Sequence, residues 1–113
     1  GTTLITDAPP DNQGRGESFS PTDLTAAALG TCVMTIMGIA AKTHGFSMEG
    51  AKSKVRKIMK SNPRRIGELK VSISLPSTLN PKQRKILEKA AHACPVGRSL
   101  SSELKDKIHI TYI

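Results

Sequence analysis

Two cysteines, Cys32 and Cys94, are the residues of this 113-residue chain whose type and context best suit chemistry. Cys32 lies in a long apolar run, and Cys94 opens the segment CPVGRSL directly after a helical pattern. A cysteine thiolate can attack a peroxide oxygen, and the resulting sulfenic acid can condense with a second cysteine to form a disulfide. This chemistry requires the two sulfurs to meet in the folded chain. The alternative is a pair of inert, buried thiols that only pack.

A long helix is predicted around Cys32. Ser20 can cap its start, Pro21 suits the first helical position, and Asp23 stands where a capping box places an acid. The helix should end at about position 43 or 44, because a glycine follows there. Residues 24–41 carry no charge, but many of them are Ala, Gly and Thr, so we predict a buried core helix rather than a membrane span.

The rest of the chain reads as strands and shorter helices. Leu69, Val71, Ile73 and Leu75 alternate with polar residues, which is typical of a strand with one buried face. Strands at 48–60 and 69–75, joined by a turn, should form an antiparallel hairpin. The other expected elements are a short strand at Thr2–Thr6, a helix at 81–94, a short helix from Pro95 through Leu104 and a strand at 107–113.

This order of elements predicts a single α+β domain over residues 1–113, in which helices pack on an antiparallel sheet in two layers. The first helix is apolar almost all round, and such a helix needs cover on more than one side. One small sheet cannot supply that cover. We therefore expect an obligate homodimer with this helix near the interface.

The chain is basic, with a net charge of +8, which favours anionic partners such as nucleic acid, an anionic surface or an acidic ligand. Much of this charge lies in residues 52–65. No aromatic residue there could stack bases, so we favour a solvated sheet face over a nucleic-acid site. The basic side chains assigned to this strand and turn surface are Lys52, Lys54, Arg56, Lys60, Arg64 and Arg65, while Lys57 interrupts the opposite, apolar face.

Compartment and cofactors follow from what the sequence lacks. Two cysteines are too few for a disulfide-rich secreted scaffold, and residues 1–10 have neither the basic nor the apolar region of a signal peptide. We expect a cytoplasmic protein with no membrane partner. The chain has no initiator Met, so N-terminal strands before residue 1 stay an open alternative. The three histidines are dispersed, and neither a metal nor another cofactor is expected.

The segment SPTDLTAAALGTC, followed about sixty residues later by CPVGRSL, resembles the osmotically inducible protein C / organic hydroperoxide resistance (OsmC/Ohr) family. The resemblance covers residues 20–113. It implies an OsmC-like fold, an intertwined homodimer with long central helices, and reduction of organic hydroperoxides through two cysteines. On this resemblance Cys32 is the attacking cysteine and Cys94 the resolving one, and an external dithiol restores both.

The chain departs from the family pattern near the start of the long helix. Peroxidase members use an Arg to hold the thiolate and a Glu to orient that Arg. Thr22 stands at the Glu position, and the acid follows at Asp23. On an ideal helix Asp23 and Cys32, nine residues apart, face opposite ways. Glu17, in the preceding loop, is a substitute for the missing Glu.

The thiolate-holding Arg has two candidates in the chain, Arg15 and Arg98. Each of them also has a possible role outside the catalytic site. Arg15 can be a solvated loop charge, and Arg98 can be a partner for Glu103. An Arg that precedes residue 1 is a third alternative, because the family places it on an N-terminal strand.

Three functions remain open on the sequence. The first is a thiol-dependent peroxidase in which Cys32 attacks an organic hydroperoxide and Cys94 resolves the sulfenic acid. The second is a family member without efficient peroxidase activity that binds a small apolar or thiol-reactive ligand at the dimer interface. The third is a basic nucleic-acid-binding module.

Overall fold

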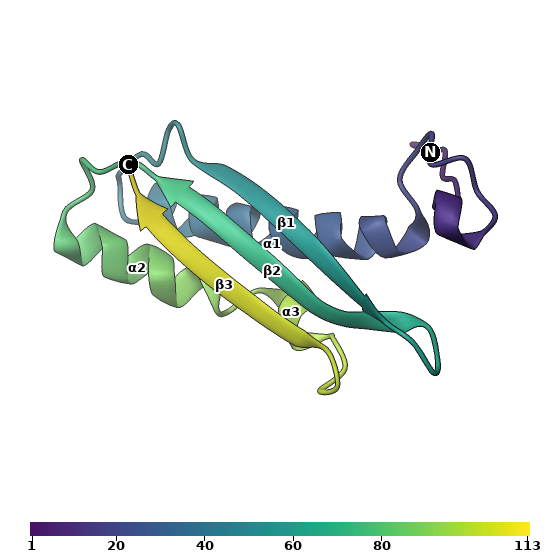
Figure 1. Ribbon diagram of the computed structural model, residues 1–113. Helices are drawn as coiled ribbons and strands as arrows, with labels where there is room; N and C mark the ends of the chain where they lie inside the picture. Colours follow the sequence, from purple (N-terminus) through teal and green to yellow (C-terminus); the bar gives the residue numbers. More distant parts are fainter.

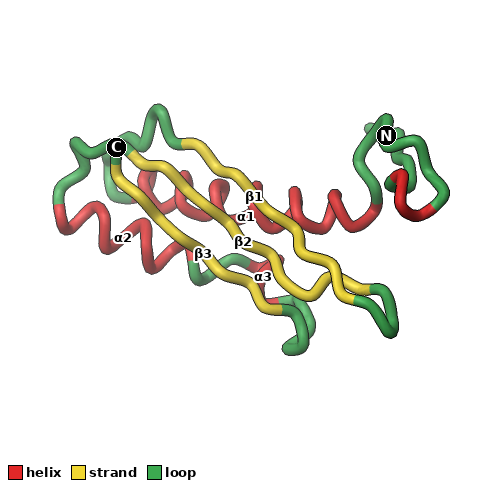
Figure 2. The backbone as a smooth tube through the Cα atoms, viewed as in Figure 1, coloured by secondary structure: helices red, strands yellow, loops and turns green.

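The computed structural model describes all residues, 1–113, and has the α+β architecture expected from the sequence. Three strands form one sheet in the order β1-β2-β3, and the helices cover one face of it (Figure 1). Figure 2 shows the two layers, with strands in front of helices. The elements are η1 (Pro10–Asn12), α1 (Pro21–Thr43), β1 (Lys52–Lys60), β2 (Arg65–Leu75), α2 (Pro81–Ala91), α3 (Pro95–Arg98) and β3 (Lys105–Tyr112).

The long helix α1 starts and stops where its sequence predicts. The Ser20 hydroxyl accepts a hydrogen bond from the Asp23 backbone N–H at 3.1 Å, and the Asp23 carboxylate accepts one from the Ser20 N–H at 3.0 Å. This reciprocal capping box satisfies two N–H groups that a helix start leaves without intrahelical partners. At the other end His44 is the cap, and Gly45 has a φ of +75°, a conformation that glycine adopts readily.

The sheet is mixed, which corrects the expected fully antiparallel sheet. β1 and β2 form the predicted antiparallel hairpin, but β3 pairs with β2 in parallel. Between β2 and β3 the chain passes through α2 and α3 on the helical side of the sheet. A strand reached through such a crossover runs in the same direction as the strand before it.

Several predicted segments differ from the structure, and the strand predicted at 48–60 begins only at Lys52. Thr2–Thr6 is not a strand, because no neighbouring strand pairs with it, and Leu4 and Ile5 are 74% and 85% exposed. α2 ends at Ala91, short of 94, and α3 ends at Arg98, short of Leu104. The residue before a proline is pushed out of helical conformation, and the residue before Pro95 is extended, with φ −67° and ψ 125°.

The core lies between α1, α2 and β2. The alternating residues of β2 predicted to face inward are all buried, at no more than 1% exposure, and they pack against one side of α1. By length and composition α1 could cross a membrane, but a core helix passes the same test. The other side of α1 is uncovered in one chain: Ile39, for example, is 57% exposed. The buried residues of α1 are Ala26, Leu29, Gly30, Val33, Met37 and Ala41.

Gly30 lies where α1 crosses β1, and a Cβ at this position would collide with the Val55 side chain. Changing Gly30 to Ala should therefore lower the free energy of unfolding by about 1–3 kcal/mol, in spite of the higher helix propensity of alanine. Urea denaturation measures this loss. The double variant G30A/V55A should be less destabilised than the sum of its single variants, and strict additivity would contradict a contact between these positions.

Candidate functional site

Cys32 lies in the middle of α1 and is half-buried against the core. On the helix its neighbours one turn away are Ala28, Leu29 and Ile36, and these do not share one environment. Leu29 is fully buried, whereas Ala28 is exposed. The apolar run around this cysteine is therefore divided between core and surface, and the thiol lies at the boundary.

Cys94 is the N-cap residue of α3 and is 3% exposed. Its Sγ accepts a hydrogen bond from the Gly97 backbone N–H at 3.4 Å. Burial raises the pKa of the Cys94 thiol, and the neighbouring Cys32 thiol raises it further; the Gly97 N–H opposes both effects. Cys94 is thus held as the neutral thiol.

The fold therefore brings together two cysteines that are 62 positions apart in the sequence. Both are free thiols, and no disulfide joins them. Contacts between α1 and α3 support this juxtaposition, and Leu29 of α1 lines the same small cavity as Cys94. Two adjacent thiols of unequal burial can form a disulfide after one of them is oxidised.

A small cavity of about 140 Å³ opens beside Cys94. Arg98 lines it from α3, and Asp106 lines it from the helix-facing side of β3. Arg98 is exposed and makes no ion pair with Glu103, so the alternative prediction that these two residues pair is wrong. Sequence reasoning missed Asp106. The sequence signal is its spacing from Ile108 and Ile110. In a strand, residues two apart face the same side, so Asp106 faces inward with these two isoleucines.

Arg15 and Glu17 do not approach the thiols within one chain. They lie in the segment before α1, where the backbone N–H of each donates to the Asp7 carboxylate at 3.1 Å. Figure 1 shows this segment beyond the N-terminal end of α1, at the opposite end of the molecule from α2. Asp23 is also remote from Cys32, because nine residues of helix span about 13 Å.

Lys57 binds the residues at the start of α1. Its ammonium donates to the Asp23 carboxylate at 2.8 Å and to the Thr22 hydroxyl at 2.9 Å. Lys57 points toward α1, and its side chain is 18% exposed. The Lys57 hydrogen bond and the Ser20 backbone N–H lower the pKa of Asp23, while burial opposes them. Asp23, the acid that follows the family's Glu position, is therefore engaged in holding the start of α1 to β1.

This anchor predicts a pH dependence of stability. The folded pKa of Asp23 lies below its ordinary value near 3.8, so the pair contributes stability at neutral pH and loses it as the pH falls through the folded pKa. Urea midpoints from pH 7 to pH 3 should decline less in D23N than in the native chain. Asparagine keeps the cap but cannot titrate. Parallel curves for the two proteins would contradict this role of Asp23.

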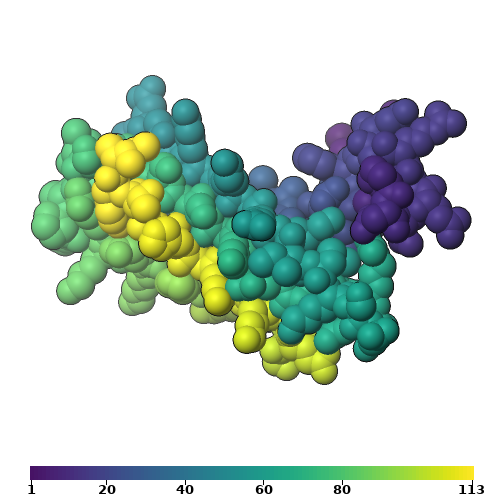
Figure 3. Space-filling view, viewed as in Figure 1, coloured from purple at the N-terminus to yellow at the C-terminus, as the bar shows by residue number.

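A second, larger hollow of about 1090 Å³ runs along α1 and β1. Phe19, Met34 and Val55 supply its apolar walls, and Lys57 closes one side. Neither cysteine lines it. In the space-filling view a hollow separates the N-terminal segment from the strands (Figure 3). No group of three or more His, Cys, Asp or Glu side chains could hold a metal ion.

Comparison with known proteins identifies a crystal structure that is similar to this chain in both fold and sequence. A crystal structure from Psychrobacter arcticus, of a protein provisionally named for osmotic stress induction and detoxification response, shares 42% identity over 94% of this chain and 77% of its own, with a TM-score of 0.87. No functionally curated protein matches the chain.

More distant structures share the fold. An organic hydroperoxide resistance protein OsmC of Legionella pneumophila is 17% identical over 93% of this chain and 78% of its own, with a TM-score of 0.76. An organic hydroperoxide resistance protein of Elizabethkingia anophelis is 14% identical over 94% and 78%, also with a TM-score of 0.76. The family model described as OsmC-like protein matches residues 14–109. The chain belongs to the OsmC-like protein family.

Proposed function

We propose that this protein is a thiol-dependent peroxidase that reduces organic hydroperoxides, with Cys32 as the attacking cysteine and Cys94 as the resolving one. The observation that carries the proposal is that the two free thiols are neighbours in the reduced chain. Their unequal burial fits the two roles. A substrate can approach the half-buried Cys32, whereas Cys94 is enclosed and needs to react only with its neighbour.

The reaction balances in three steps. The Cys32 thiolate attacks one oxygen of the hydroperoxide, the O–O bond breaks, and the remaining alkoxide takes a proton and leaves as the alcohol. The Cys94 sulfur then attacks the Cys32 sulfenic acid, an S–S bond forms, the S–O bond breaks, and the hydroxyl leaves as water with the Cys94 proton. An external dithiol reduces the disulfide by exchange.

Arg98 is the proposed cation for this site, because it lines the cavity beside Cys94 and is not engaged in an ion pair. Arg15, Glu17 and Asp23 lie at or before the start of α1, away from the thiols of their own chain. In the homodimer that we propose, the uncovered side of α1 meets a second copy. Any contribution of these three residues to the site would then come from that copy.

Mass spectrometry tests the proposal directly. One equivalent of cumene hydroperoxide should convert the reduced protein into a species with a Cys32–Cys94 disulfide within a single chain. Reduction with a dithiol should return the starting mass. Unmodified thiols after this treatment would contradict the peroxidase.

A second candidate is a family member that binds a small apolar or thiol-reactive ligand without efficient turnover. The hollow between α1 and β1 favours it, because it is large and has apolar walls. The engagement of Asp23 by Lys57 favours it as well, since this acid is then not free to orient an arginine. Unmodified thiols in the mass spectrum together with saturable binding of an apolar ligand would support this candidate.

A further inference from the structure

The outward face of the sheet carries most of the protein's surplus positive charge. Ser53 and Val55 of β1 lie against Gly30 of α1, so the residues that alternate with them point away from the helices. In Figure 1 this face is turned toward the reader, and the helices lie behind it. Six exposed cations define what is here called the basic face: Lys52, Lys54, Arg56, Lys70, Lys105 and Lys107.

The strand register places these cations side by side. Lys70 of β2 stands directly between Arg56 of β1 and Lys107 of β3. Like charges directly opposite each other on neighbouring strands are destabilising, so folding alone does not favour this row. Glu68 is the one carboxylate on this face, and it is bonded to Lys107 at 3.1 Å.

We propose that the basic face docks on an anionic lipid bilayer surface. The array extends in two dimensions, over three strands about 4.8 Å apart and over outward residues about 6.7 Å apart along each strand, so a planar layer of phosphate headgroups can meet all of it at once. Five of the six cations are lysines, whose compact, hydrated charge suits diffuse attraction rather than bidentate recognition of a single group.

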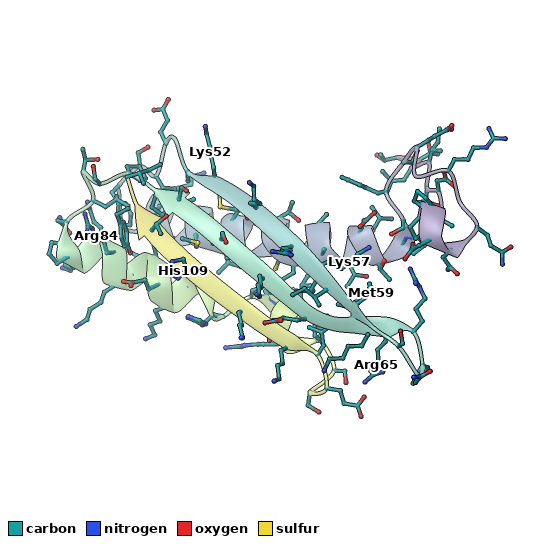
Figure 4. The ribbon with its side chains drawn as sticks, in the orientation of Figure 1. Lys52, Lys57, Met59, Arg65, Arg84 and His109 are labelled. Carbon is teal, nitrogen blue, oxygen red and sulfur yellow. The ribbon has the colours of Figure 1, made fainter.

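The surroundings of the basic face argue against a bound nucleic acid. Its six positions are interleaved with Ser72, Ser74, His109 and Thr111, and no Phe, Tyr or Trp lies among the outward residues of the strands. Bases therefore have no aromatic platform on which to stack. Lys52 and His109 are labelled on these strands in Figure 4. The larger hollow runs along α1 and the β1 edge, and of the six cations only Lys54 and Arg56 line it, so it is no recess for a small anion at the centre of the basic face.

The basic face and the thiol pair lie on opposite sides of the sheet, so this proposal does not depend on peroxidase activity. Docking leaves both cysteines in place, and a peroxidase that does not dock remains a peroxidase. The two proposals can therefore fail separately.

Vesicle sedimentation tests the docking. The full chain is mixed with phosphatidylcholine vesicles with or without about 30% phosphatidylserine, at low and at physiological salt. We expect binding only with phosphatidylserine, and weaker binding at the higher salt because exposed charges are screened. The variant K52Q/K54Q/K70Q leaves the Lys107–Glu68 pair intact and should lower the partition coefficient about a hundredfold.

The matched control is K82Q/K85Q/K89Q, which removes the same charge from exposed positions of α2 on the other layer. It should bind anionic vesicles almost as well as the native chain. An equal loss in both variants would show an effect of net charge only and would overturn the proposal. So would the absence of binding to anionic vesicles by the native chain, or binding of a duplex oligonucleotide without binding of vesicles. Circular dichroism verifies that both variants are folded.

Discussion

Replacing Cys32 by serine should abolish thiol-dependent consumption of cumene hydroperoxide, with a loss of at least about 10³-fold in kcat/KM, because the attacking sulfur is gone. Peroxide consumption coupled to oxidation of an external dithiol measures this loss. The substitution is nearly isosteric at a half-buried position, so the unfolding transition should change little.

The matched variant Cys94→Ser separates the two roles. It should still react once with hydroperoxide, but the product should stop at the Cys32 sulfenic acid, because no neighbouring thiol remains to displace the hydroxyl. A sulfenic-acid-selective reagent such as dimedone should then label Cys32 in this variant and much less in the native chain. Labelling of Cys94 in the Cys32→Ser variant at a comparable rate would reverse the proposed assignment.

Replacing Leu29 by alanine should lower the free energy of unfolding by about 2–5 kcal/mol, since the side chain is fully buried and its removal leaves a cavity in the core. Leu29 also lines the cavity beside Cys94. Burial is the main reason for the raised pKa of Cys94, so admitting water there should lower that pKa toward its ordinary value. Urea denaturation measures the first effect. The pH dependence of alkylation of Cys94, in a Cys32→Ser background, measures the second.

Leu4→Ala is the control for this variant, because it removes the same atoms from a side chain that is 74% exposed. Its unfolding free energy should stay within about 0.5 kcal/mol of the native value. A loss in Leu4→Ala similar to that in Leu29→Ala would contradict the placement of the core. An alkylation profile unchanged by Leu29→Ala would contradict the link between this cavity and the Cys94 thiol.

The sequence predicted those parts of the fold that depend on local chemistry. The Ser20 cap with Pro21 and Asp23 positioned the start of α1, and period-two alternation identified the buried face of β2. Two predictions that required knowledge of the strand partner were wrong. Thr2–Thr6 has a strand-like composition but no strand beside it, and β3 was assigned to an antiparallel sheet although its crossover connection makes it parallel to β2. Strand pairing is a property of the whole chain, and local composition does not encode it.

The candidate site divides in the same way. The sequence by itself determined the residue types: two cysteines in a family-specific context, a basic strand and a missing Glu at Thr22. Only the tertiary structure decided which groups meet. It brought Cys32 to Cys94 across 62 positions, placed Arg98 and Asp106 at the cavity beside Cys94, and bound Asp23 to Lys57. It also aligned Lys70 with cations on both neighbouring strands. The physical reason is that the reactivity of a thiol and the interaction between charged side chains depend on their burial and on the distances between groups. The packing of the helices on the sheet sets both.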